Sequence, residues 1–152
     1  MQIKQKDAGQ FIGRSIEIAG KGIHDEKYSQ EKTAFYQELF KLGMMKELMP
    51  VSKDKKGYAL IIPIENGIRY FAGILSDVYI EGYEKLEITS QSYVVLAAQD
   101  GISRNLFDQL EDTFFTDKEK SVQYNGKEVL EVLLNGNPAN AEVELWVPVT
   151  NE

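Results

Sequence analysis

The residues best suited to chemistry lie in the last predicted strand, residues 142–149, which reads Glu-Val-Glu-Leu-Trp-Val-Pro-Val. Successive side chains of a strand point to opposite faces, so Glu144 and Trp146 share one face and the aliphatic residues between them share the other. A large ring beside a carboxylate is typical of a solvent-exposed rim pair, or of one wall of a pocket for an apolar cation. Both interpretations are open for Glu144 and Trp146.

A second carboxylate, Glu131, is predicted to face Glu144 across the last hairpin. If the chain turns around 137–138, the residue numbers of paired positions add up to about 275. Glu131 would then lie opposite Glu144 on the same face. Two facing carboxylates repel each other, and the pKa of one is raised unless a cation lies between them. The alternative is an exposed cross-strand pair bridged to Lys127 or Lys120.

The aromatic residues suggest what this face could bind. The chain holds 8 tyrosines, 7 phenylalanines and 1 tryptophan, together 11% of its residues. If Tyr36, Tyr70 and Tyr93 meet Trp146 in one cleft, they form an aromatic box with Glu144 at its floor. Such a box favours flat, apolar cations through ring stacking and cation–π attraction, each worth ~0.5–2 kcal/mol. The alternative is that Tyr36 and Tyr70 are core residues with satisfied hydroxyls.

Composition excludes several other kinds of site. The chain has no cysteine and a single histidine, His24, which argues against disulfides, thiolate chemistry and an ordinary zinc site. His24 is expected in a surface loop. Residues 20–22, Gly-Lys-Gly, lack the Gly-Lys-Ser/Thr element of a phosphate-binding loop, and Asp77 and Glu81 make only a weak case for a metal. We therefore expect neither a metal nor a cofactor.

Charge and hydropathy indicate a cytoplasmic protein that binds neither nucleic acid nor membranes. The formal net charge is −7 and the pI is about 4.9, which argues against a basic surface for nucleic acid. The charged start at residues 1–7 has no apolar run behind it, unlike a signal peptide. No window approaches the roughly 20 apolar residues that cross a bilayer.

The predicted elements occur twice in the same order. Strands are predicted at 11–19, 58–64, 68–75, 93–99, 123–134 and 142–149, with a short one at 84–88. Helices are predicted after a cap at Asp25 or Ser29 and at 102–115. Asn66-Gly67 predicts a hairpin, because both residues adopt positive φ readily.

Strand, helix and hairpin thus repeat in halves at about 10–76 and 90–150 of one domain spanning 1–152, with 76–92 crossing between them. The repeat predicts an α+β fold of duplicated β-α-β-β units related by a pseudo-two-fold axis. Its antiparallel sheet would carry two helices on one side. The seam between the halves would form a central cleft, where small ligands usually bind.

The chain resembles the GyrI-like small-molecule-binding domains, also described as the effector-binding domains of bacterial transcription activators. The resemblance covers about residues 10 to 150. It rests on the aromatic-rich first helix around Phe35 and Tyr36 and on segments 68–74, 86–93 and 143–149, the last with the closing Glu-x-aromatic-x-Pro pattern. It implies the duplicated fold with a central ligand cleft. No DNA-binding domain precedes residue 10, so we expect a stand-alone member without direct control of transcription.

The resemblance also implies roles for individual residues. Glu144 would be the family's buried acidic residue, and Trp146 would replace the more usual tyrosine of that strand. Tyr70 and Tyr93 would fall on recurrent aromatic positions. The resemblance implies a role for Glu131 less strongly, because only some members of the family have an acidic residue at that position.

Three functions are open. The first is binding of hydrophobic, cationic or planar small molecules with Glu144 as counter-charge, for multidrug sensing or sequestration. The second, as in stand-alone members that resemble hydrolases, is opening of strained-ring genotoxic natural products, with Glu144 or Glu131 as base and Tyr70 as donor. The third is a protein-interaction role like that of the gyrase-inhibitor members, with DNA gyrase or a regulator as partner.

Overall fold

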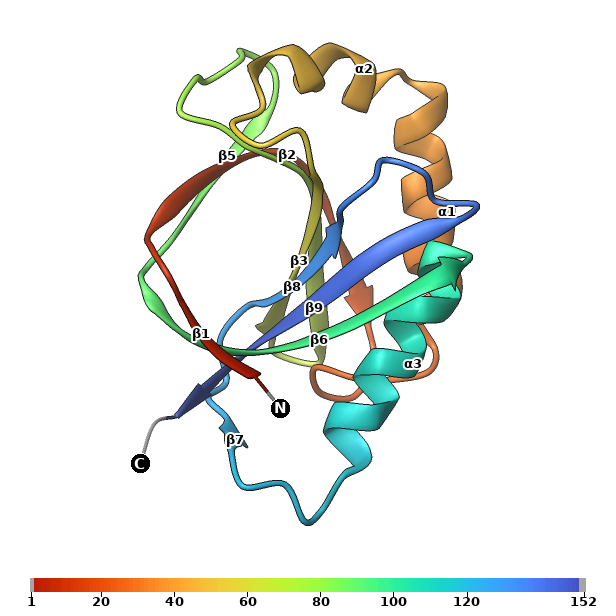
Figure 1. Ribbon diagram of the computed structural model, residues 1–152. Helices are drawn as coiled ribbons and strands as arrows, with labels where there is room; N and C mark the ends of the chain where they lie inside the picture. The colour runs from red at the N-terminus through yellow and green to blue at the C-terminus, as the bar shows by residue number, and fades with distance from the viewer. Residues whose placement is uncertain (1, 151–152) are drawn as a thin grey trace.

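The computed structural model describes residues 2–150 and has an α+β fold, as predicted. One antiparallel sheet carries the long helices α1 and α3 on the same side (Figure 1). The strands are β1 (Gln2–Lys6), β2 (Gly9–Ala19), β3 (Gly57–Ile64), β4 (Gly67–Leu75), β5 (Glu84–Ile88), β6 (Gln91–Gly101), β7 (Gln123–Tyr124), β8 (Val129–Leu133) and β9 (Ala141–Thr150). The helices are α1 (Tyr28–Lys41), α2 (Met44–Leu48), the short 3-10 helix η1 (Met49–Val51) and α3 (Ser103–Thr116). No helix within residues 2–150 is long and apolar enough to span a membrane.

The sheet order, β1-β6-β9-β8-β3-β4-β2-β5, confirms the predicted duplication. One unit is β2-α1-β3-β4 and the other is β6-α3-β8-β9, and they join along β3 and β8. Each unit is preceded by a short strand that pairs with the other unit. Thus β1 leads into β2 but pairs with β6, and β5 leads into β6 but pairs with β2. The halves therefore hold each other through exchanged edge strands.

The hairpin between β3 and β4 forms as predicted, but its turn lies one residue earlier. Ile64 pairs with Gly67, so the turn residues are Glu65 and Asn66, and Asn66 has a φ of 62°. Gly67 is a strand residue without positive φ. A side chain there would come within 2.1 Å of the Ile18 carbonyl oxygen. Glycine is therefore needed at position 67 because β2 and β4 pack closely there, and not because of the turn.

Two other predicted boundaries differ from the structure. The strand expected at 123–134 is broken into β7 and β8, because Gly126 takes a φ of 85° and turns the chain between them. Helix α1 begins without a side-chain cap. Ser29 lies inside it and donates to Asp108 instead, while the Asp25 carboxylate accepts from the backbone of Lys21 and Lys27.

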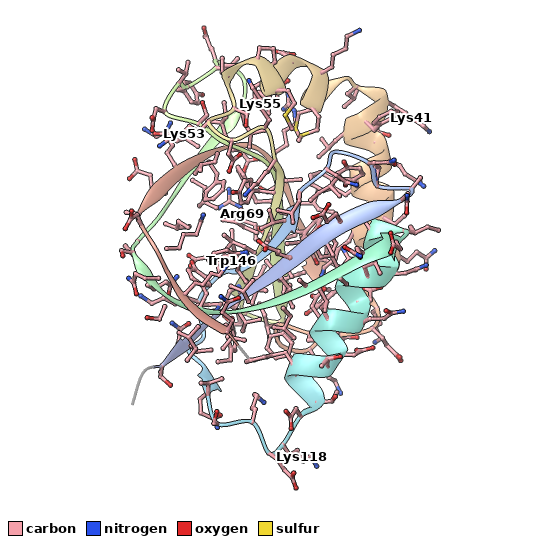
Figure 2. The ribbon with its side chains drawn as sticks, in the orientation of Figure 1. Lys41, Lys53, Lys55, Arg69, Lys118 and Trp146 are labelled. Atoms are coloured by element: carbon pink, nitrogen blue, oxygen red, sulfur yellow. The ribbon has the colours of Figure 1, made fainter. Side chains whose placement is uncertain are left out.

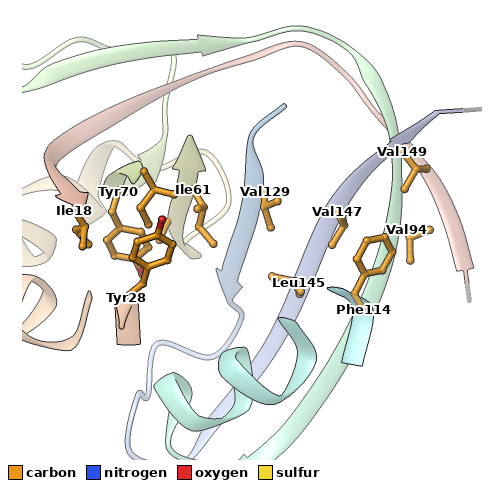
Figure 3. Packing of buried hydrophobic residues seen from close by; sticks show 12 residues of the cluster. Ile18, Tyr28, Ile61, Tyr70, Val94, Phe114, Val129, Leu145, Val147 and Val149 are labelled. Atoms are coloured by element: carbon orange, nitrogen blue, oxygen red, sulfur yellow. The ribbon is translucent and has the colours of Figure 1, made fainter. Parts of the chain in front are cut away.

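The two faces of the sheet bury different clusters. The helix side includes Ile61, Leu145 and Val147, and Figure 3 shows residues of β9 facing Phe114 of α3. The opposite face buries Phe11, Tyr58, Leu60, Phe71, Ile88, Tyr93, Leu130 and Val132, with Trp146 packed against them. Both faces are therefore apolar where the strands are central, so a residue's face cannot be judged from hydropathy alone.

Leu60 tests the joint between the two units. It is 0% exposed and pairs with Leu130 across that joint. Leu60→Ala should lower the free energy of unfolding by about 2–5 kcal/mol, because it leaves a cavity in the core. Leu42→Ala makes the same change at a side chain that is 66% exposed, and should alter stability by less than about 0.5 kcal/mol. Urea denaturation measures both, and equal losses would contradict this account of the joint.

Candidate ligand-binding site

A cavity of about 690 Å³ lies between the helices and the sheet, within the roughly 300–1,000 Å³ range of small-molecule sites. Both units contribute to it, through α1, β3 and β4 and through the start of α3, β8 and the β8–β9 loop. The lining residues are Lys32, Thr33, Tyr36, Gln37, Phe40, Lys41, Met45, Gly57, Tyr58, Ala59, Tyr70, Ala72, Gly73, Ile102, Ser103, Arg104, Phe107, Glu131, Leu133, Pro138 and Ala139.

Small residues on the sheet leave this space open. Ala59 of β3 pairs with Ala72 of β4 on one side and with Glu131 of β8 on the other. Paired residues of neighbouring strands share a face, so the short alanine side chains leave the region beside Glu131 unfilled. Tyr36 and Phe40 are four residues apart on α1, so they lie on one side of that helix and add aromatic rings to the wall.

Glu131 lies at the centre of a buried charge cluster. Its side chain is 1% exposed, and both of its oxygens accept hydrogen bonds from Arg104, at 3.1 and 2.7 Å. Lys32 of α1 donates to Oε2 at 3.3 Å, and the Tyr70 hydroxyl of β4 donates to Oε1 at 2.6 Å. The bidentate arginine pair is the strongest geometry that this carboxylate can form.

Two further acids complete the cluster. Glu111 of α3 accepts from Lys32 at 3.1 Å and from Arg104 at 3.0 Å. Asp108 accepts from Arg104 at 2.9 Å. Arg104, Asp108 and Glu111 recur along one side of α3 at intervals of four and three residues, so the helix itself brings them together.

Burial and charge act differently on the two buried glutamates. Burial alone would raise the pKa of Glu131, but Arg104 and Lys32 outweigh it, so this pKa lies well below its usual range. Burial raises the pKa of Glu111 to about 8, although Lys32 opposes the shift. Burial and the Glu131 carboxylate raise the pKa of Tyr70 well above its ordinary value. At neutral pH Glu131 is therefore charged and the Tyr70 hydroxyl remains a donor, while burial favours the protonated form of Glu111.

The structure separates the residues that the sequence groups together. Tyr36, Tyr70 and Glu131 line the cavity, and Glu144, Trp146 and Tyr93 do not. The predicted pairing of Glu131 with Glu144 is wrong, because Glu131 pairs with Leu145 and Glu144 with Val132. The residue numbers of paired positions in β8 and β9 therefore add up to 276 rather than about 275. That difference of one residue places the two carboxylates on opposite faces of the sheet.

The sequence predicts a cationic ligand beside Trp146, and in the structure two lysines of the protein itself lie there. Figure 2 shows Trp146 on the side of β9 away from α1 and α3. Lys4 and Lys6 of β1 lie 5.8 and 5.2 Å from its ring centre. Its indole N–H donates to Glu144 at 3.1 Å, and the Tyr93 ring packs edge-on at 5.7 Å. This face therefore satisfies its own ring and carboxylate internally.

Sequence reasoning missed Lys32, Arg104 and Glu111. A signal for two of them was present. Lys32 and Glu111 stand at buried positions of the apolar stripes of α1 and α3, where a charged residue needs a buried partner. Arg104 carried no such signal, because it lies at the start of α3 and its bonds to Glu131 and Tyr70 are set by tertiary structure.

His24 lies in the loop between β2 and α1, and its side chain has two partners there. Its Nε2 lies 2.6 Å from the Asp112 carboxylate, and its ring stacks on Phe115 at 5.6 Å. Within residues 2–150, no group of three or more potential ligand side chains is placed to hold a metal ion.

The raised pKa of Glu111 predicts a pH dependence of stability. The folded protein holds a proton that the unfolded chain releases above the ordinary value of 4.5. This contribution is fully present below that value and is lost as the pH rises through about 8. The free energy of unfolding should therefore fall between pH 5 and 8, by at most about 1.4 kcal/mol per pH unit.

Glu111→Gln mimics the protonated side chain and should flatten this slope in urea titrations at pH 5, 6, 7 and 8. Glu119→Gln, in an exposed loop outside the cluster, is the matched control and should follow the wild type. A Glu111→Gln protein with the wild-type slope would show that Glu111 does not hold the proton.

Comparison with known proteins places this geometry in a family. The sequence model described as Cass2, integron-associated effector binding protein, matches residues 2–149. No curated protein matches the sequence. Three solved structures show the same fold at low identity, and each covers nearly all of this chain.

The first is SAV2435 bound to tetraphenylphosphonium, with a TM-score of 0.84 and 17% identity over 99% of this chain and 93% of that one. The second is a putative bacterial transcription regulation protein from Staphylococcus aureus MU50, with a TM-score of 0.78 and 16% identity over 99% and 97%. The third is the integron cassette protein VCH_CASS2 from the mobile metagenome of Vibrio cholerae, with a TM-score of 0.65 and 14% identity over 98% and 95%. With the match over residues 2–149, they confirm the GyrI-like resemblance, and the chain belongs to the Cass2 family of integron-associated effector binding proteins.

Proposed function

We propose that this protein binds hydrophobic, ring-containing small molecules in the cavity between α1, α3 and the sheet, and that it serves to sense or sequester them. The observation that carries the proposal is a cavity of about 690 Å³ that both units line, with Glu131 at its floor. Membership of an effector-binding family supports it. So does SAV2435, a relative of the same fold that is bound to tetraphenylphosphonium.

The wall residues give a physical account of such binding. Tyr36, Phe40 and Phe107 present rings to the cavity, and each contact between aromatic rings is worth ~0.5–1.5 kcal/mol beyond the area buried. The Tyr36 hydroxyl makes no hydrogen bond within the described chain, so it is free to bond a ligand. Phe40 and Ile102 are 72% and 55% exposed, and a ligand would cover part of this apolar surface.

A lipophilic cation is one candidate ligand, and the tetraphenylphosphonium relative favours it. In that case Glu131 would take the role that the sequence suggested for Glu144. The ion pairs of Glu131 weigh against it, because Arg104 and Lys32 already neutralise this carboxylate.

The hydrolase alternative also depends on Glu131 in this cavity. A general base works best when its pKa lies near the operating pH, and Arg104 and Lys32 hold the pKa of Glu131 well below that, against the effect of burial. Binding without turnover is therefore the better-supported proposal. A protein partner such as DNA gyrase stays a hypothesis from the family resemblance.

Filling the mouth of the cavity tests the proposal. Ala139 lines the cavity from the exposed β8–β9 loop. Ala139→Trp should weaken binding of the neutral dye Nile red about tenfold or more, measured by fluorescence titration, because the ring occupies ligand space. Ala34→Trp makes the same change on an exposed residue of α1 outside the lining and should leave affinity unchanged. Equal affinity in all three proteins would place the dye elsewhere and refute the cavity as the site.

Glu144 offers a separate test of the sequence-based assignment. Glu144→Gln should bind Nile red with wild-type affinity, because Glu144 lies on the face of the sheet away from the cavity. Thermal unfolding of the variant serves as the control for intact folding. A tenfold loss of affinity in a folded variant would restore Glu144 as a ligand-binding residue.

A further inference from the structure

The charge cluster beside the cavity contains more acids than cations. Lys32 and Arg104 carry its positive charges, and each of them bonds to both buried glutamates, Glu111 and Glu131. A third acid, Asp108, lies 2.8 Å from Arg104. With every group ionised, two positive charges face three negative ones, so the cluster would carry a net charge of −1. A net charge in the interior is costly unless a further positive charge compensates it.

A proton can supply that charge, and Glu111 is the acid best placed to hold it. The Asp108 side chain is 32% exposed, so water stabilises its ionised form. Glu131 accepts four hydrogen bonds from three side chains. Glu111 is 1% exposed, and within residues 2–150 it accepts bonds from Lys32 and Arg104 alone. The acid with the least solvent and the fewest donors is the one most readily protonated.

The other groups packed around Glu111 leave this assignment unchanged. The Tyr70 hydroxyl of β4 donates to Glu131 and stays protonated, since burial and Glu131 raise its pKa well above the ordinary value. Strands β6 and β9 also pack against α3, and they meet it with the apolar side chains Val94, Leu96, Ala98, Val143, Leu145 and Val147. Burial, together with the neighbouring Glu131 carboxylate, raises the pKa of Glu111 to about 8, although Lys32 and Arg104 oppose the shift.

Lys32 and Arg104 connect Glu111 to the cavity. Both line the cavity, whereas Glu111 and Asp108 lie behind them. The Lys32 ammonium is 3.1 Å from Glu111 and the Arg104 guanidinium is 3.0 Å from it. Glu111 is therefore a single side chain away from a ligand. A charge in the cavity acts strongly over this distance, because the interior screens charges much less than water does.

We propose that Glu111, acting through Lys32 and Arg104, is a positioning residue that releases a proton to solvent when a lipophilic cation binds in the cavity. The inference rests on the proposed function and specifies how pH would regulate that site. Without a ligand, the proton on Glu111 balances the third acid. A bound cation supplies the same positive charge, so the proton is no longer needed. The ion pairs of Glu131 then remain intact, and Glu111 provides the counter-charge.

This exchange fixes the direction of the pH dependence. A ligand that displaces a proton binds more tightly as the pH rises, because fewer protons compete with it. The affinity increases by at most about tenfold per pH unit for one proton. It levels off above about pH 8, where Glu111 is already ionised without a ligand. A neutral ligand replaces no proton, so its affinity should not follow the pH.

Calorimetric titration of the wild-type protein with tetraphenylphosphonium tests the exchange. The affinity should rise about fivefold or more from pH 6 to pH 8. Titrations at pH 7 in buffers of different ionisation enthalpy should show release of roughly half a proton or more per bound ion. The affinity for neutral Nile red, measured by fluorescence, should change by less than about twofold over the same range.

Two variants assign the proton, each in a protein shown by thermal unfolding to be folded. Glu111→Gln should bind tetraphenylphosphonium with a pH-independent affinity and without proton release. Asp108→Asn removes the third acid at a partly exposed position, so it should also abolish most of the release. Glu119→Gln, in an exposed loop, is the matched control and should behave like the wild type. Undiminished release in Glu111→Gln or Asp108→Asn overturns the inference.

Nile red separates this inference from the proposed function. If Nile red binds while tetraphenylphosphonium does not, or binds without proton release and with a flat pH profile, the inference is overturned and the proposed function stands. If neither compound binds the wild-type protein, both are overturned.

Discussion

The buried pairing of Glu131 with Arg104 and Lys32 is the interaction on which the functional region depends. It joins β8 and α3 of one unit to α1 of the other, and Tyr70 adds β4. Such clusters add little net stability, because removing the charges from water offsets most of their attraction. Removing one partner is nevertheless costly, since it leaves an unpaired buried charge. The cluster therefore fixes where the helices lie relative to the sheet.

The cavity follows from that placement and from the small residues beneath it. Ala59 and Ala72 pair on the sheet where larger side chains would have filled the space under the helices. The exchanged edge strands β1 and β5 tie the two units together on either side. The site is thus framed by both units, and its floor is charged yet already neutralised. These two properties together argue for hydrophobic ligands.

Much of the fold could be predicted, because its signals are local. The structure contains three features that these local signals predict. They are the helix around Phe35 and Leu39, the turn before Gly67 and the repeated order of elements. Tyr36, Tyr70 and Glu131 also belong to the predicted set of site residues. The cationic half of the site was not foreseen, although Lys32 and Glu111 interrupt apolar stripes and so indicated buried charge. Arg104 could not be found in this way, because its partners come from other elements or from later turns of α3.

The sequence by itself determined the alternation of the last strand, and hence that Glu144 and Trp146 share a face. Only the tertiary structure decided what that face would contact. The β8–β9 loop shifts the register by a single residue from the expected one, and since side chains alternate, one residue exchanges the faces. Glu131 therefore faces the helices and the cavity. Glu144 and Trp146 face β1, where Lys4 and Lys6 complete the aromatic and charged contacts that the sequence had suggested for a ligand.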